Sequence, residues 1–416
     1  MVEPGQETEE APRYRWVVMG LWSLSTVSGY SVVNTIGILL PAISSEFGLS
    51  PGQQGLLGSA AFWGGLALTI PLGWWTSRFR PKALTTVTMI VGTMVLFFHA
   101  WAPGFALLLI SRVAFGITPI AREPARAFLI RQWFPQREIV MANAIFNLLF
   151  GVIVGAGLLV TPFILAGSDD EWRRPIYVFG GYFVVLTLLW MVLGRERPGT
   201  HEQQAEDEAP HEVGVLSRAL SYRDLWVAGV GFLGADLAWS AFVSFYPTLM
   251  LSTHDLSLRW SGAILAIFII TGGVSGIALG YVAMTGARRR MTLQALGVLM
   301  AGTYAGMTLS SSLPVVMVLS FLNGIAWGFW PILYSVAFFL PGIRPRETAI
   351  AMAFLWVMIS VGTVIGPLLV GYLQELMGSL ETALLIAGFA TLSLTMAGTV
   401  LRPGAEPTPT NPVLQV

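Results

Sequence analysis

Apolar runs of about 20 residues recur along the whole chain, and short polar segments separate them. A helix rises about 1.5 Å per residue, so a run of this length crosses the roughly 30 Å hydrocarbon core of a bilayer. The pattern therefore predicts twelve membrane-spanning helices. Their expected ranges are 16–43, 53–76, 82–101, 105–131, 139–166, 175–194, 225–251, 260–284, 290–309, 314–340, 347–375 and 380–401.

The longest internal polar segment lies between the sixth and seventh predicted helices. This segment, residues 195–224, is rich in Glu and Asp and is typical of a solvated cytoplasmic linker. It separates an N-terminal six-helix bundle, 16–194, from a C-terminal six-helix bundle, 225–402. Polar cytoplasmic tails, 1–15 and 403–416, flank the two bundles. The predicted fold is an all-α membrane protein with twelve transmembrane helices in two pseudo-symmetric bundles.

The two predicted bundles repeat one another in sequence. Gly55 and Gly73 in the second helix recur as Gly262 and Gly280 in the eighth, at one constant offset. Transporters built from such repeats bind their substrate at the interface between the repeats, near the middle of the membrane. We therefore expect the functional site between the two halves.

Composition excludes several other classes of function. The chain is 55% hydrophobic and only 11% charged, whereas a soluble domain has roughly 25% charged residues. Zero net charge gives no reason to expect nucleic acid, and the absence of cysteine excludes thiolate metal sites. The four histidines form no local metal motif, and no nucleophile–base pair or phosphate-binding loop is present. We expect no metal, no cofactor, no enzymatic activity and no direct use of ATP.

The placement of Lys and Arg predicts the orientation. If both termini are cytoplasmic, most of the 23 Lys and Arg residues fall on the inner side, and only Arg173, Arg174 and Arg259 fall on the outer side. This asymmetry follows the positive-inside rule. We expect a multi-pass protein of the cell inner membrane with both termini in the cytoplasm.

Four charged residues lie inside the predicted fourth helix: Arg112, Arg122, Glu123 and Arg126. Each costs about 2.5 kcal/mol or more at the bilayer centre, which makes such residues candidates for a functional site. At about 100° per residue, Arg112, Glu123 and Arg126 share one helix face, with Arg122 about 80° away. One carboxylate does not neutralise three guanidinium groups, and Arg suits carboxylate recognition. We therefore expect an anionic substrate.

Depth divides these four residues into two groups. Arg112 lies deeper in the predicted helix and is the preferred substrate contact, with structural pairing as the alternative. Arg122, Glu123 and Arg126 lie nearer the cytoplasm. For them three interpretations stay open: substrate attraction, a salt-bridge network at the inner gate, and a helix end that reaches the interface.

Asp236 is the other intramembrane charge, near the midplane of the predicted seventh helix. A carboxyl group at that depth favours its neutral form and is able to exchange protons as the cavity opens to either side. We assign Asp236, together with Glu123, to proton coupling. A protonated or Arg-paired structural aspartate is the alternative.

Aromatic and amide side chains complete the predicted site. The segment Trp327-Gly328-Phe329-Trp330-Pro331 stands out, because Gly and Pro soften the helix beside two large rings. Each candidate either contacts substrate or packs between helices. The candidates are Tyr30, Asn34, Trp63, Trp239, Tyr246, Asn323, Trp327 and Trp330.

Three passages resemble a known family. They are Ser59 to Gly73; Arg112-x-x-x-Gly116 with Pro124-Ala125 and Trp133-Phe134-Pro135-x-x-Glu138; and Phe245-Tyr246-Pro247-Thr248-Leu249. Together they resemble the major facilitator superfamily over essentially the full length, and most closely its anion:cation symporter branch. The resemblance implies transport of a small anion, with Arg112 at a position the family uses.

The chain departs from that pattern at several positions. Ser77 and Met284 stand where the loop motif of the superfamily normally has aspartate. Pro119 replaces the glutamate that the branch often carries in helix 4, and Tyr30 to Asn34 lacks its charged pair in helix 1. The usual proton-coupling residue of the branch is thus absent.

We predict a secondary transporter that moves a small organic anion, with a carboxylate as the expected chemistry, by alternating access and with proton coupling. Its expected partners are the substrate, protons and the lipid bilayer, and we expect a monomer. Two alternatives remain open: efflux of amphipathic drug-like compounds, which the aromatic content favours, and a membrane receptor or binding protein that does not transport.

Overall fold

The computed structural model describes residues 13–76, 79–135, 138–196, 215–282, 286–338 and 340–402. These residues form helices joined by short loops, and no strand occurs among them. The core of the acidic linker, residues 197–214, and the tails 1–12 and 403–416 lie outside the described residues.

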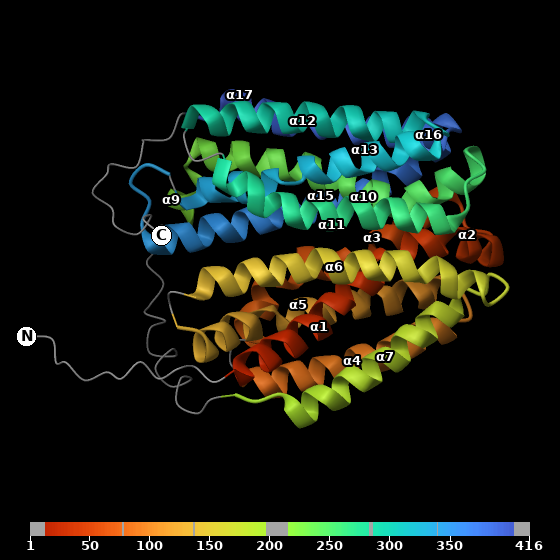
Figure 1. Cartoon of the computed structure of the whole chain (residues 1–416), viewed down its shortest axis with the longest axis horizontal. Coiled ribbons are helices and arrows are strands. Elements are labelled where there is room, and N and C mark those ends of the chain that lie inside the picture. Colours follow the sequence, from red (N-terminus) through yellow and green to blue (C-terminus); the bar gives the residue numbers. More distant parts are fainter. Residues whose placement is uncertain are drawn as a thin grey trace, which may run out of the picture.

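The first half of the chain forms one group of helices, drawn in red to yellow-green in Figure 1. Their bounds are α1 Tyr14–Asn34, α2 Ile36–Phe47, α3 Pro51–Thr76, α4 Pro81–Trp101, α5 Phe105–Trp133, α6 Ile139–Ala166 and α7 Arg173–Leu193. The first predicted span corresponds to α1 and α2 together, which a break at Thr35 separates.

The second half forms the other group, drawn in green to blue in Figure 1. A short helix, α9 Val215–Leu220, precedes it within the predicted linker. The bounds are α10 Arg223–Thr253, α11 Leu258–Val282, α12 Gly286–Leu309, α13 Leu313–Ala326, α14 Phe329–Tyr334, the 3-10 helix η2 Ser335–Phe338, α15 Pro345–Met377, α16 Leu380–Phe389 and α17 Leu392–Val400.

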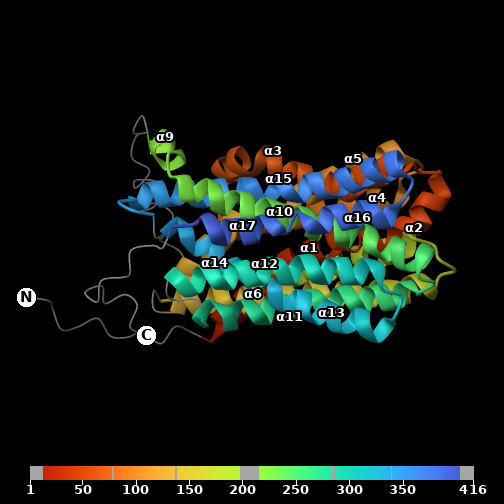
Figure 2. The same ribbon diagram turned by 90° about the horizontal axis from the view of Figure 1, so that it is seen from above.

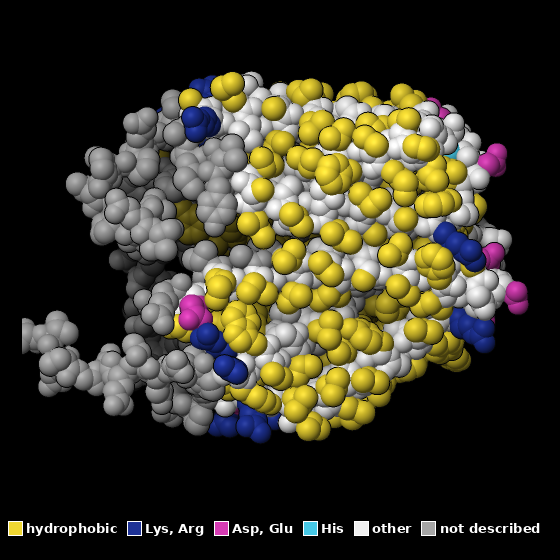
Figure 3. Space-filling view, in the orientation of Figure 1, with side chains coloured by type: hydrophobic (Ala, Val, Ile, Leu, Met, Phe, Trp, Pro, Cys, Tyr) yellow, Lys and Arg dark blue, Asp and Glu magenta, His cyan; other side chains and the backbone are white. Residues whose placement is uncertain are grey.

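Length and composition make this helical assembly suited to a membrane. Ten of the described helical segments are long and apolar enough to cross a bilayer. The helices α3, of 26 residues, and α12, of 24 residues, lie beside them and complete the predicted set. Figure 3 shows apolar side chains over the middle of the visible face and charged side chains toward both ends. Exposed apolar residues such as Ile110 and Val192 are suited to contact with lipid hydrocarbon chains.

Three spans are interrupted near their middle, and one of these breaks separates α16 from α17 at Ala390 and Thr391. Between α1 and α2, Asn34 Nδ2 donates to the Tyr30 carbonyl and Thr35 Oγ1 donates to the Val32 carbonyl. Such side-chain bonds compete with the regular helical ladder. Between α13 and α14 the break falls at Trp327 and Gly328. Broken helices at this depth are tolerated where they face protein or a cavity, and they often mark transporter sites.

The two groups of helices contact each other most closely at the α2 end. Figures 1 and 2 place α3 beside α15 and α6 beside α11. Glycine permits the close approach of Gly55 to the Pro367 carbonyl and of Gly37 to the Val243 carbonyl, where a Cβ atom would clash with the backbone. The Gly52 amide also donates to Glu375 Oε1 across the interface, at 2.9 Å.

The opposite end, where α9 lies, is less tightly joined. Figure 3 shows a recess between the two groups of helices at that end. Each ion pair among the described residues joins side chains of the same group. These pairs are Arg15–Glu138, Arg126–Glu123, Arg173–Glu46 and Arg218–Glu347. No ion pair among the described residues therefore holds the two groups together at the α9 end.

Candidate functional site

Helix α5 carries the charged residues that the sequence singled out. It runs through Pro119, which lacks an N–H and leaves the carbonyl of Phe115 without its usual partner. Thr118 Oγ1 donates to that carbonyl at 2.9 Å. The helix thus continues past the proline and presents Arg122, Glu123 and Arg126 on its following turns.

Arg112 is buried among backbone groups, with 3% of its surface exposed. Its Nε donates to the Leu57 carbonyl of α3 and its Nη2 to the Val33 carbonyl of α1, both at 2.7 Å. These are short, charge-assisted bonds. Val33 lies two residues before the break at Thr35, so Arg112 ties the interrupted first span to α3.

Arg122 is completely buried, and one nitrogen of its guanidinium group has no hydrogen-bond partner. Its Nε donates to the Thr118 carbonyl and its Nη1 to the Ser25 carbonyl, each at 3.2 Å. Its Nη2 has no hydrogen-bond partner. A Cβ atom at Gly29 would lie 3.9 Å from this Nη2, so the small residue on α1 leaves room beside it.

Glu123 and Arg126 form an ion pair that is partly exposed. Arg126 Nε lies 3.2 Å from Glu123 Oε2, and the two side chains are 28% and 30% exposed. The guanidinium of Arg126 also lies over the Phe146 ring, 4.5 Å from its centroid, which is a cation–π contact. Tyr30 of α1 is near enough to Glu123, Arg126 and Arg122 to interact with their charges. Glu123 and Arg126 stand three residues apart on the helix, the spacing at which side chains of opposite charge pair.

An aromatic wall from the other group of helices faces these charges. Trp330 and Tyr334 of α14 stack with ring centroids 5.3 Å apart, and Trp356 of α15 packs against Trp330 at 5.6 Å. Trp356 Nε1 donates to Tyr334 Oη at 3.0 Å. Arg126 lies close enough to Tyr334 for an electrostatic interaction. Arg126 of α5 and Tyr334 of this wall therefore lie near one another, although they belong to different halves.

Asp236 of α10 is buried without a cationic partner among the described residues. Its side chain is 5% exposed, and Oδ2 has no hydrogen-bond partner. Tyr304 of α12 lies near enough to Asp236 for an electrostatic interaction. Burial of an unpaired carboxylate costs several kcal/mol, so the packing around Asp236 favours the neutral acid.

Three of the other predicted site residues form internal bonds within their own group of helices. Asn34 donates to the Tyr30 carbonyl. Asn323 Nδ2 donates to Thr303 Oγ1 at 2.7 Å and is fully buried. Tyr246 is also fully buried and stacks on Phe242 at 4.4 Å. The structure thus places these three side chains in helix packing rather than beside Arg126.

Trp239 joins the two halves through aromatic contacts. It packs against Phe62 of α3 at 6.4 Å and against Trp327 at 6.2 Å. Trp63 is partly exposed, and its Nε1 donates to Ser59 Oγ at 2.9 Å. The aromatic ring system therefore continues from the break in α13–α14 across the interface to α3.

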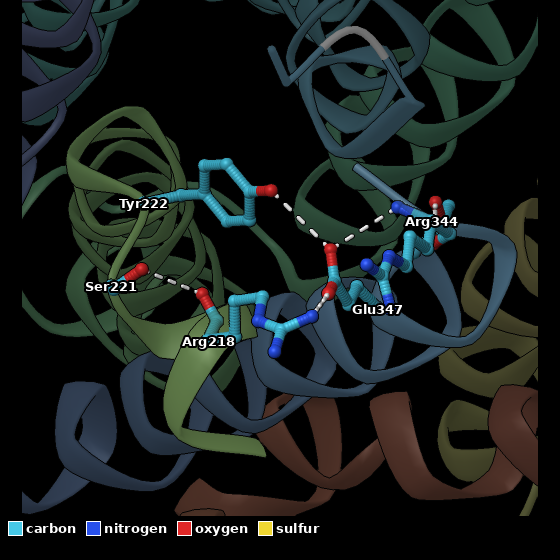
Figure 4. A network of polar contacts seen from close by, with 6 residues as sticks. Arg218, Ser221, Tyr222, Arg344 and Glu347 are labelled. Carbon is cyan, nitrogen blue, oxygen red and sulfur yellow. Dashed lines mark hydrogen bonds and ion pairs between the residues drawn. The ribbon is translucent and has the colours of Figure 1, made fainter. Parts of the chain in front are cut away.

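A separate polar network lies at the α9 end (Figure 4). Glu347, at the start of α15, accepts hydrogen bonds from the Arg344 amide at 3.1 Å and from Tyr222 Oη and Arg218 Nη1 at 3.3 Å each. The Arg344 amide, followed by Tyr222 and Arg218, holds the pKa of the Glu347 carboxyl below its usual value. The network fastens α9 and the start of α10 to α15.

Residues 21–343 match the Major Facilitator Superfamily, which covers most of the chain. The chain belongs to this superfamily. It is therefore a membrane transporter and not an enzyme, and its fold is the twelve-helix arrangement that the sequence predicts.

Curated transporters resemble the chain over nearly its whole length. It is 25% identical to the uncharacterized transporter YybO of Bacillus subtilis (strain 168), covering 93% of this chain and 94% of the relative. It is 23% identical to the probable galactarate/D-glucarate transporter GarP of Escherichia coli (strain K12), with the same coverage. It is 25% identical to the probable sulfoacetate transporter SauU of Cupriavidus necator, covering 90% of each chain.

A solved structure gives the same fold. The crystal structure of a bacterial homolog to the human lysosomal transporter Spinster, in an inward-facing and unoccupied conformation, superposes with a TM-score of 0.74. The alignment covers 93% of this chain and 94% of that chain at 16% identity. This likeness concerns the architecture of the superfamily.

Some members of the site went unrecognised in the sequence of this superfamily member. Trp356, Phe146 and Tyr304 were not among the predicted residues, although each lies against a residue that was. Trp356 and Phe146 sit in apolar spans with no local charge or Gly/Pro signal, so only their place in the fold distinguishes them from lipid-facing aromatics.

Proposed function

We propose that this protein is a secondary transporter that moves a small organic anion, with a carboxylate as the recognised group, across the cytoplasmic membrane by alternating access. The observation that carries the proposal is the arrangement of Arg122, Glu123 and Arg126. Glu123 pairs with Arg126 alone, and Arg122 Nη2 is buried without a partner. A substrate carboxylate would supply the missing charge and acceptor.

The relatives support an anionic substrate. The names of GarP and SauU refer to galactarate, D-glucarate and sulfoacetate, all of which are anions at neutral pH. Because sequence identity is only 23–25%, these names support a substrate class and no particular compound.

The recess supports an inward-facing state. The asymmetry of Lys and Arg favours an orientation with the α9 end and both termini in the cytoplasm. In that orientation the close backbone contacts of Gly37 and Gly55 lie on the outer side, and the partly exposed pair of Glu123 and Arg126 lies in the half of α5 nearer the cytoplasm. Alternating access would separate the α2 end and close the α9 end.

Proton coupling is assigned to Asp236. In its buried setting the carboxyl group holds a proton, and exposure to water on opening to one side would release it. Glu123 is the second candidate, because its ion pair with Arg126 is partly exposed and would be disturbed when substrate binds.

The test is uptake of labelled organic acids into proteoliposomes, with and without an inward proton gradient. We expect the gradient to drive accumulation. Asp236→Asn should abolish gradient-driven accumulation but spare counterflow, because counterflow needs binding and rocking but no net proton movement. Asp255→Asn is the matched control, since Asp255 has φ 53° in the loop after α10 and Asn tolerates this conformation. Accumulation that persists in Asp236→Asn would overturn the coupling assignment.

The aromatic wall of Trp330, Tyr334 and Trp356 favours one alternative, the efflux of amphipathic compounds. The same vesicles separate the two functions. Transport of lipophilic cations or neutral drugs, without any transport of carboxylates, would replace the organic anion by an amphipathic substrate.

A further inference from the structure

We infer that a cavity between α6 and α11, at the α2 end, binds the headgroup of a phospholipid that carries a primary ammonium group. Arg259 would bind the phosphate and Asp170 the ammonium, and phosphatidylethanolamine is the lipid of this chemistry. The site is separate from the charges of α5 and does not depend on which substrate the protein carries. Because each half of the protein contributes one of the two charges, a bound lipid would hold the halves together at this end.

The cavity has a volume of about 200 Å³ and lies where the two halves meet. One half contributes the last turn of α6, with Leu165, and the loop that follows, with Asp170. The other half contributes Leu251 of α10 and Arg259 of α11. Figure 1 shows these helix ends beside one another at the α2 end. Pockets for drug-sized ligands measure roughly 300–1,000 Å³, so this cavity suits one part of a larger molecule, such as a headgroup.

Two opposite charges line the cavity without neutralising each other. Asp170 and Arg259 are both exposed, and neither takes part in an ion pair among the described residues. The helix dipoles add to both charges, because α11 begins at Leu258 and α6 ends at Ala166. The cavity therefore has a positive side that suits a phosphate and a negative side that suits an ammonium group.

The surroundings of the cavity favour a lipid as its occupant. Helices α6 and α11 run across the face that Figure 3 shows to be apolar over its middle. Phe163 of α6 is 53% exposed, and the Arg259 guanidinium lies 5.4 Å from the centroid of its ring. Trp260 is 43% exposed, and tryptophan is enriched at the level of the headgroups. An acyl chain can thus lie on the apolar surface while the headgroup reaches the cavity.

The two charges predict which headgroup binds best. A guanidinium group suits the phosphate that every phospholipid carries. A primary ammonium has three N–H donors for the Asp170 carboxylate, whereas the quaternary nitrogen of choline has none. A glycerol headgroup has no cation and leaves Asp170 facing the negative phosphate. Phosphatidylethanolamine should therefore bind better than phosphatidylcholine or phosphatidylglycerol.

The experiment measures lipid binding to the purified protein by native mass spectrometry, with the three lipids carrying identical acyl chains. Wild-type protein should bind phosphatidylethanolamine more tightly than either other lipid by about twofold or more. Arg259→Gln should weaken phosphatidylethanolamine and phosphatidylcholine alike by about two- to fivefold, the range for exposed charges, because both carry the phosphate. Asp170→Asn should weaken phosphatidylethanolamine alone, and Asn tolerates the φ of 60° at this position.

Two nearby charges provide matched controls. Asp169→Asn changes the adjacent carboxylate, which has φ 51° and does not line the cavity. Arg174→Gln removes an exposed arginine at the start of α7. Both variants should bind phosphatidylethanolamine as the wild-type protein does. Thermal unfolding gives a second measurement, since this lipid should raise the midpoint of the wild-type protein more than that of Asp170→Asn/Arg259→Gln.

Several results would overturn the inference. A preference for phosphatidylglycerol would mean that the protein selects negative charge alone, and equal binding of the three lipids would mean that no headgroup is recognised. Equal losses in Asp169→Asn and Asp170→Asn would remove Asp170 as the partner of the ammonium. Displacement of the lipid by an equal concentration of soluble phosphoethanolamine would replace the lipid by a soluble zwitterion. Uptake of organic acids is measured separately, so each of these results leaves the proposed function standing.

Discussion

The contact between Glu375 and Gly52 predicts how the closed α2 end is held. Glu375 of α15 accepts the Gly52 amide, at the start of α3, across the interface at 2.9 Å. The first amides of a helix have no partner within the helix and favour a negative charge. The carboxylate thus acts as a cap that is made only when the two halves meet at this end.

The expected effect of Glu375→Ala follows from that cap. The bond to the Gly52 amide exists only in the closed arrangement, so its loss weakens that state alone. Because Glu375 is exposed and water screens its charge, the ratio of closed to open molecules should drop by about two- to fivefold. Binding of substrate from the outer side should become easier to the same extent.

Spin-label distances measure this ratio directly. The chain has no cysteine, so Glu171→Cys and Thr253→Cys introduce a single labelled pair, one on each half at the α2 end. Double electron–electron resonance should give mainly short distances with Glu375 present and a larger long-distance fraction in Glu375→Ala. Glu381→Ala is the control, since Glu381 lies in the first turn of α16 at the same end. An unchanged distribution in Glu375→Ala would refute the capping argument.

Two other predictions concern the arginines and the network at the α9 end. Arg112→Gln removes two bonds to buried carbonyls and should lower the free energy of unfolding by about 3 kcal/mol or more, at roughly 1.5–3 kcal/mol per charged hydrogen bond. Arg126→Gln should retain stability but lose carboxylate binding. Thermal unfolding measures the stability of both variants, and titration with a carboxylate measures their binding. If Arg112→Gln lost binding while Arg126→Gln kept it, Arg112 would be the residue that contacts the substrate. The lowered pKa of Glu347 means that its network stabilises the fold above the unfolded-state pKa and is lost as pH falls through the lower folded-state value. Unfolding measured from pH 7 to pH 3 should therefore show an acid-induced loss of stability that is smaller in Glu347→Gln, and equal losses in both proteins would contradict this role.

The extent of the helices was predictable from the sequence. The expected span 139–166 coincides with α6, and the other boundaries agree within a few residues. The reason is that a lipid environment demands long apolar runs and leaves polar residues for the ends. The breaks within the spans were less visible, since at Thr35 the interruption comes from side-chain bonds that many helices tolerate.

The candidate site was predictable only in part. The pairing of Glu123 with Arg126 follows from helix geometry and needed no knowledge of other helices. The surroundings of Arg112 did not follow, because its partners are carbonyls of α1 and α3, distant in sequence. Counting residues along one helix gives a depth and a face but cannot tell whether that face meets backbone or open space.

The class of this protein follows from local features of its sequence: it is a membrane transporter of two repeated halves, with charge on one face of its fourth span. Hydrophobic length, charge asymmetry and repeated glycines carry that information locally. The tertiary structure decided which charges remain available. Arg112 is engaged by buried carbonyls, Arg126 lies over Phe146 and near Tyr334 of α14, and Asp236 lies buried without a partner among the described residues. These differences arise where helices from distant parts of the chain meet, because hydrogen-bond satisfaction and burial are properties of that packing.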